Sequence, residues 1–180
     1  MAQPFFTIGH SSRSLEEFLA LLCENGVACL VDIRKLPGSR AQPQFNAASL
    51  GAALAGQGMD YLHLAALGGL RGRTAGVAPE CNGLWRNASF HRYADYALTP
   101  AFRAGLEQLL ALGRERRCAL MCAEALWWRC HRRIVADHLL ARGEAVLHIM
   151  GPGRLEPARL TPGAVVGEGG VVSYPPASSA

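Results

Sequence analysis

Short apolar runs alternate along the chain with segments in which apolar residues recur every three or four positions. A strand buried on both faces of a parallel sheet gives the first pattern, and a helix with one buried face gives the second. The apolar runs predict strands at 5–8, 27–33, 61–64, 118–122 and 145–150. The periodic segments predict a helix from 15 up to Gly26 and further helices at 47–55, 89–96, 100–112 and 130–142.

Local signals support the ends of several predicted helices. Ser14 and Glu17 fit a capping box, in which a hydroxyl and a carboxylate satisfy free backbone N–H groups. Thr99 followed by Pro100 is typical of a helix start, since proline is tolerated in the first turn. Gly143 ends the last predicted helix, because glycine readily adopts the left-handed conformation that closes a helix.

The order of the elements predicts the fold. Strands that alternate with helices favour right-handed crossovers, so we expect an α/β fold with a mostly parallel sheet of about five strands and helices on both faces. A chain of 180 residues without internal repeats is expected to form a single domain. We assign the α/β domain to 1–150.

Two segments lack a regular pattern. The stretch 151–180 is rich in glycine and proline, so we expect an irregular tail that packs on the domain or trails from it. A short pairing near 165–166 or 171–172 is the exception we expect there. The glycine-rich segment 67–83 is long enough to be either a functional loop or a disordered one.

The charge of the chain is carried almost entirely by arginine. The formal net charge is +4, and Lys35 is the only lysine among 18 lysine and arginine residues. A coding bias would produce this excess without any function. A functional origin would be a surface suited to phosphate or carboxylate, because guanidinium groups bind both in a bidentate manner.

No segment of the sequence indicates a membrane protein. Charged residues interrupt every apolar run before it reaches the roughly 18 residues that a spanning helix needs, and the first residues lack the features of a signal peptide. We therefore expect a cytoplasmic protein without a membrane partner, in which the six cysteines are mostly reduced. Cys23, Cys29 and Cys118 lie in apolar runs and are expected to be inert.

Reactive or charged side chains follow most of the predicted strands. Because ligands of open α/β sheets bind beyond the carboxyl ends of the strands, we expect these side chains to form one site. The candidates, in chain order, are His10, Ser11, Asp32, Arg34, Arg40, Arg71, Cys122, Glu124, Cys130, His131, Arg132 and His148.

Cys130 is the strongest candidate nucleophile, with Cys122 as the second. In the first turn of the predicted helix, Cys130 would meet free N–H groups and the positive end of the helix dipole. The neighbouring cations Arg129, His131 and Arg132 would also favour the thiolate. The alternative is a structural cysteine whose neighbours point away from it.

The other candidates have roles that follow from their chemistry. His10 or His131 would transfer protons, and Glu124 would act as a base or hold a guanidinium group. Asp32 and Arg34 share one face of a strand, so that Asp32 could orient a guanidinium or an imidazole. Anionic groups of the substrate would be bound by Arg34, Arg40, Ser11, Arg71, Arg132 and His148.

These residues favour an enzyme that acts on a phosphate-bearing substrate, nucleic acids included. One alternative is a nucleic-acid-binding module without catalysis, in which Trp127, Trp128 and Tyr93 would stack on bases rather than pack in the protein. Another is a thiol-redox or metal-binding protein that uses Cys122 and Cys130. Because the spacing of these cysteines matches no tight pair of metal ligands, we assign no metal site. The sequence leaves both the cofactor and the oligomeric state open.

Several ordered motifs resemble one family, the domain of unknown function number 488. They are T-I-G-H-S at 7–11, D-I-R at 32–34 with P-G-S-R at 37–40, Y-L-H-L at 61–64 with L-G-G at 67–69, C-A-E at 122–124, C-H-R at 130–132 and H-I at 148–149. The resemblance covers about 7–150. It departs from the family pattern at 126–128, where a proline commonly lies. The resemblance implies an α/β domain with a shared polar site, and it carries no established reaction.

Overall fold

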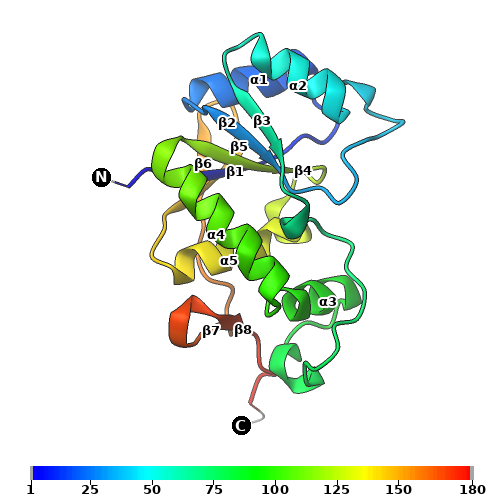
Figure 1. Cartoon of the computed structure of the whole chain (residues 1–180), viewed down its shortest axis with the longest axis vertical. Helices are drawn as coiled ribbons and strands as arrows, with labels where there is room; N and C mark the ends of the chain where they lie inside the picture. The colour runs from blue at the N-terminus through cyan, green and yellow to red at the C-terminus, as the bar shows by residue number, and fades with distance from the viewer. Residues whose placement is uncertain (1, 179–180) are drawn as a thin grey trace.

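The computed structural model describes residues 2–178, which fold around one six-stranded sheet (Figure 1). The strands are β1 (Phe5–Gly9), β2 (Cys29–Asp32), β3 (Asp60–His63), β4 (Cys118–Cys122), β5 (Val146–Gly151) and β6 (Arg154–Pro157). Their order is β3-β2-β4-β1-β5-β6. The first five run parallel and β6 pairs antiparallel with β5. The predicted α/β class and mostly parallel sheet are confirmed.

Five helices connect and cover these strands. They are α1 (Leu15–Glu24), α2 (Ala47–Ala55), α3 (Ala88–Tyr96), α4 (Pro100–Glu115) and α5 (Arg132–Ala141). The predicted caps form at α1 and α4, where Ser14 accepts from the backbone of Glu17 and Thr99 accepts from that of Phe102. Each cap satisfies a backbone donor that the helix itself leaves free.

The helices lie on both faces of the sheet, as predicted (Figure 1). On one face, α1 and α2 bury an apolar cluster that includes Phe18 and Leu50 against Ile8 of β1. On the other face, α4 and α5 bury a second cluster that includes Leu109 and Ile134. The alternation of side chains along each strand supplies apolar residues to both clusters.

One predicted helix start was wrong, and one strand was not predicted. The helix predicted at 130–142 begins at Arg132, because Cys130 has an extended backbone (φ −127°, ψ 150°) and follows a 3-10 turn at Trp127–Arg129. The sheet has six strands instead of about five. All four residues of β6 are exposed, so this strand carries no apolar pattern that could reveal it.

The tail lies against the domain. Two short strands, β7 (Val165–Val166) and β8 (Val172–Ser173), pair with each other at the positions where a pairing was expected. Tyr174 is fully buried, and its hydroxyl donates to the carboxylate of Asp137 on α5 at 2.7 Å. Its backbone N–H donates to the side chain of Asn82 at 3.0 Å. These contacts attach the tail to α5 and to the segment that precedes α3.

Within residues 2–178, the structure contains no helix that is both long and apolar enough to cross a lipid bilayer.

Candidate functional site

The sheet has a switch in connection at β4. Its neighbours β1 and β2 lead into α1 and α2 on one face, whereas β4 leads into α5 on the opposite face. Chain segments that leave adjacent parallel strands in opposite directions open a crevice beyond the carboxyl ends of those strands. The fold therefore places a crevice at the end of β4.

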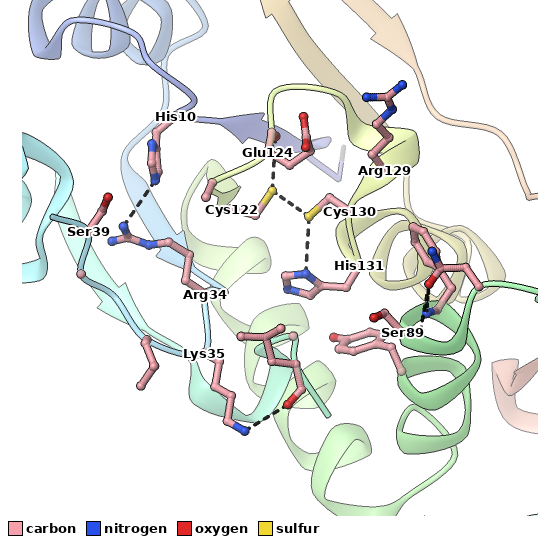
Figure 2. Close-up of a pocket in the computed structure, with 18 residues that line it drawn as sticks. His10, Arg34, Lys35, Ser39, Ser89, Cys122, Glu124, Arg129, Cys130 and His131 are labelled. Carbon is pink, nitrogen blue, oxygen red and sulfur yellow. Dashed lines mark hydrogen bonds between the residues drawn. The ribbon is translucent and has the colours of Figure 1, made fainter. Parts of the chain in front are cut away.

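A pocket of about 660 Å³ occupies this position (Figure 2). It is lined by residues from the ends of β1, β2 and β4, from the segment before α5 and from α3. Six of the twelve predicted site residues line it: His10, Arg34, Cys122, Glu124, Cys130 and His131.

Close packing of two loops forms one wall of the pocket. The backbone N–H groups of His10 and Ser11 donate to the carbonyls of Cys122 and Ala123, each at 2.9 Å, which extends the β1–β4 pairing past the strand ends. A side chain at Gly9 would collide with the Glu124 carbonyl. Glycine at this position therefore allows His10 and Cys122 to share one wall.

Two buried thiols meet on the floor of the pocket. Cys122 ends β4 and Cys130 precedes α5, and their sulfurs are 2.7 Å apart (Figure 2). The backbone N–H of Arg132 points at the sulfur of Cys130 at 3.5 Å. The side chains of Cys122 and Cys130 are only 2% and 6% exposed, so a reactant reaches them only through the pocket.

The two thiols differ in how readily they ionise. Burial opposes ionisation of Cys122, but the hydrogen bond from the Cys130 thiol and the charge of Arg132 lower the pKa of Cys122 below its ordinary value. Burial and the neighbouring Cys122 raise the pKa of Cys130 well above the ordinary value. A thiolate therefore forms first on Cys122, whereas the sequence favoured Cys130. The helix N-terminus lies two residues further on and does not outweigh these effects.

His131 provides a proton acceptor beside the thiols. Its Nε2 donates to the carbonyl of Ile33 at 2.7 Å, which leaves the lone pair on Nδ1. This Nδ1 lies 3.4 Å from the sulfur of Cys130. Burial, followed by the charge of Arg132, lowers the pKa of His131 to about 4. The imidazole is therefore neutral at pH 7 and presents its free lone pair to the Cys130 thiol.

Arg34 is held rigidly at the opposite wall. Its Nε and Nη2 donate to the carboxylate of Asp32 at 2.7–3.2 Å, and Nη2 also donates to the carbonyl of Phe45. Tyr61 donates to the same carboxylate at 2.5 Å. Asp32 is fully buried and does not line the pocket, so it orients the guanidinium, as its shared strand face suggested.

The remaining nitrogen of Arg34 points toward His10. Nη1 lies 3.5 Å from Nε2 of His10. The Nδ1 of His10 donates to the carbonyl of Ser11 at 2.9 Å, and the ring stacks on Phe45 at 4.4 Å. Burial lowers the pKa of His10, with a smaller contribution from the charge of Arg34. The pocket therefore holds two neutral imidazoles with fixed tautomers, each with one unprotonated ring nitrogen, and burial makes both of them weaker bases than a free imidazole.

Arg132 is turned away from the pocket opening. It is 1% exposed, and its Nη2 donates to the carbonyls of Glu124 and Ala125 at 2.9 and 2.8 Å. It thus holds the loop between β4 and α5 and places a positive charge close to the thiols. Its predicted role as a substrate-binding residue has no support in this geometry.

Four other predicted residues lie outside the pocket lining. Arg71 donates to the carbonyls of Gly68 and Ala65 and packs over a tyrosine ring. His148 lies in the middle of β5, bonded to Thr7 at 2.5 Å and covered by the Trp127 ring at 4.6 Å. The last two are Ser11, which lies in the turn after β1, and Arg40, which is exposed.

Sequence reasoning missed much of the pocket opening. Lys35, Leu36 and Leu70 line it, and α3 contributes Ser89 and Phe90. Leu36 and Leu70 are 71% and 75% exposed, although both are leucines. An apolar residue two positions after Arg34 was the available signal for Leu36. No local signal indicates α3, because only tertiary packing brings it to the sheet edge.

The aromatic residues considered for base stacking differ in their surroundings. Trp127 stacks on His148, and Tyr93 is buried and donates to the carbonyl of Leu67. Trp128 is 40% exposed. Among residues 2–178, no group of three or more histidine, cysteine, aspartate or glutamate side chains is arranged to hold a metal ion.

The fold and the site together define an α/β protein with a thiol–imidazole pocket at the switch point of its sheet. The chain belongs to the family described as domain of unknown function DUF488, whose family model matches residues 14–139. No curated protein and no solved structure matches the chain.

Gly69 allows the His131 ring to occupy its position. A Cβ at Gly69 would lie 2.9 Å from Nδ1 of His131, so Gly69→Ala should displace the ring from Cys130. We expect alkylation of Cys130 by iodoacetamide to slow by about tenfold or more. The rate is followed by peptide mass in a Cys23→Ser/Cys81→Ser background, which lacks the two exposed thiols. Gly72→Ala is the matched control, since no atom lies within 4 Å of its Cβ. Equal rates in both variants would contradict this role of His131.

Buried histidines should make the fold sensitive to acid. The pKa of His131 and of His138 is lowered to about 4, and that of His148 to about 3, in each case first by burial. In the unfolded chain these groups bind protons near pH 6.5. Between pH 6.5 and 4 the unfolded state therefore binds more protons, and the free energy of unfolding falls as the pH is lowered.

His138→Phe isolates one of these contributions. The ring packs on Phe102 at 4.9 Å, and within the described chain its Nε2 has no hydrogen-bond partner. We expect the substitution to reduce the dependence of the unfolding free energy on pH by up to about 1.4 kcal/mol per pH unit. Urea denaturation at several values between pH 4 and 7 measures it. An unchanged slope would show that His138 does not stay neutral in the folded protein.

Proposed function

We propose that this protein is an enzyme that acts on a phosphate-bearing substrate, with the Cys122 thiolate as nucleophile and Arg34 as the anion-binding group. The contact between Cys122, Cys130 and His131 on the floor of the pocket carries this proposal. It combines a thiol of lowered pKa, a second thiol that donates a hydrogen bond to it and a neutral base at 3.4 Å from that second thiol. Thiol nucleophiles of enzymes are activated by neighbouring groups of this kind.

The charge of the pocket lining supports an anionic substrate. The lining contains three cations, Arg34, Lys35 and Arg129, and one carboxylate, that of Glu124. Arg34 is preorganised, because Asp32 fixes its orientation, and its Nη1, which lies 3.5 Å from Nε2 of His10, is the nitrogen that would bind an anionic oxygen. Preorganised donors stabilise developing negative charge without reorganising during the reaction.

The proposed reaction has two steps. The Cys122 thiolate attacks phosphorus, so that a sulfur–phosphorus bond forms as an ester oxygen–phosphorus bond breaks and the alcohol leaves with a proton from solvent. Water then attacks phosphorus, so that an oxygen–phosphorus bond forms as the sulfur–phosphorus bond breaks, Cys122 leaves as the thiolate and the phosphate product is released; His10 accepts the water proton at Nε2. The exposed Leu36 and Leu70 would contact the organic part of the ester.

Phosphate binding tests the role of Arg34. Arg34→Lys keeps the positive charge but removes the guanidinium group that Asp32 orients through paired hydrogen bonds. The lysine side chain is therefore no longer held in position to bind phosphate. We expect the affinity for inorganic phosphate and nucleoside monophosphates, measured by calorimetry, to fall by about tenfold. Arg40→Lys, on an exposed arginine outside the pocket, should leave it unchanged. Equal affinities in the two variants would contradict the assignment.

Turnover tests the role of the thiols. The substrates to be tested are phosphate monoesters, phosphate diesters and short single-stranded oligonucleotides. For any ester that the protein cleaves, Cys122→Ser should lower the rate of cleavage by orders of magnitude. The exposed Cys81→Ser is the control. Oligonucleotide binding that weakens steeply with salt, without turnover, would contradict the enzyme and support the non-catalytic alternative.

A further inference from the structure

Two buried thiols in contact form a chemical unit that phosphate chemistry does not require. A nucleophile needs a neighbouring donor, and backbone N–H groups or a hydroxyl would serve for that purpose. Here the donor is the sulfur of Cys130, 2.7 Å from the sulfur of Cys122. Among the six cysteines, these two line the pocket and are both buried.

We propose that Cys122 and Cys130 are a dithiol–disulfide couple, oxidised by a hydroperoxide that enters the pocket and restored by a dithiol reductant. Cys122 is the residue that the peroxide oxidises, and Cys130 is the residue that resolves the product. This inference depends on the geometry of the pair and not on the phosphate-bearing substrate.

The loop between the two cysteines is held in place by contacts that do not involve sulfur. The Arg132 guanidinium donates to the carbonyls of Glu124 and Ala125, and Trp127 packs on His148 at 4.6 Å. A 3-10 turn at Trp127–Arg129 returns the chain to Cys130. The reduced protein therefore already keeps the sulfurs together, and closing the bond costs little further chain entropy.

The neighbours of each sulfur assign the two roles. Arg132 stabilises a thiolate on Cys122, which is the form that attacks a peroxide. The base, Nδ1 of His131, lies next to Cys130, at 3.4 Å. Cys130 is therefore the thiol that can be deprotonated in a second step, after the charge on Cys122 has been consumed.

The chemistry balances in two steps. The Cys122 thiolate attacks the outer peroxide oxygen, the oxygen–oxygen bond breaks, and the alkoxide takes a proton from solvent, which leaves a sulfenic acid on Cys122. His131 then accepts the Cys130 proton, and the Cys130 sulfur attacks that of Cys122. The sulfur–oxygen bond breaks, and hydroxide leaves as water with the proton from His131. Two thiols are oxidised, and the peroxide is reduced to an alcohol and water.

Peroxide titration of the intact chain tests the couple. The protein carries Cys23→Ser and Cys81→Ser, which remove the exposed thiols. One equivalent of hydrogen peroxide should consume two thiols and link the tryptic peptides 118–129 and 130–132, and fragmentation should place the bond on Cys122. Dithiothreitol should reverse the link. A link from Cys118 or Cys29, or no loss of thiols, would overturn the proposal.

Single variants separate the two roles. Cys130→Ser should stop at a sulfenic acid on Cys122, which dimedone traps, whereas Cys122→Ser should slow the reaction with peroxide by roughly tenfold or more. Identical behaviour of the two variants would overturn the assigned roles. Far-ultraviolet circular dichroism shows whether each variant is folded. If a variant does not fold, the peroxide titration of the protein that retains both Cys122 and Cys130 still decides the proposal.

The outcome is distinguishable from that of the proposed function. Disulfide formation is measured without any phosphate compound, so an absence of ester turnover would leave it standing. Conversely, if Cys122 and Cys130 never form a disulfide, the redox proposal fails, but the proposed ester cleavage by Cys122 is unaffected. If both hold, peroxide should abolish ester turnover and dithiothreitol should restore it.

Discussion

The Arg132 guanidinium, bound to the carbonyls of Glu124 and Ala125, is the interaction on which the site depends. A charged group that is 1% exposed is costly to bury unless polar groups surround it. Here Nη2 binds two loop carbonyls and so holds the chain between β4 and α5 in its bend, whereas Nε and Nη1 have no hydrogen-bond partner among the described residues. That bend returns Cys130 to Cys122, and the same charge favours a thiolate between them.

The rest of the pocket follows from the position of β4 in the sheet. Because β4 lies between β2 and β1, the ends of three strands converge, and each delivers one group: Arg34 after β2, His10 after β1 and Cys122 at the end of β4. Gly9 and Gly69 permit the close approach, since a side chain at either position would strike the Glu124 carbonyl or the His131 ring. The chemistry of the site is thus set by backbone packing as much as by its reactive side chains.

Sequence patterns predicted the elements well, because buried parallel strands and capped amphipathic helices have strong local signatures. They failed where the deciding contact is distant in the chain. His148 was placed at the site because a histidine near a strand end is exposed to ligands, but β5 continues to Gly151 and Trp127 covers the ring.

The same limit applies to the thiols. Their position at the strand–helix junction could be read from the sequence, but their mutual contact could not, because it depends on how the Arg132 side chain folds the loop. The order of ionisation depends on that contact as well.

A site-resolved alkylation profile tests the central claim, that Cys122 ionises more readily than Cys130. The alkylation rate of each cysteine is measured by peptide mass from pH 5 to 10. The account predicts that Cys122 reaches half its maximal rate below the ordinary cysteine value of about 8.5, and that Cys130 does so well above it. Half-maximal rates for Cys122 at or above that value, or the same profile for both thiols, would contradict it.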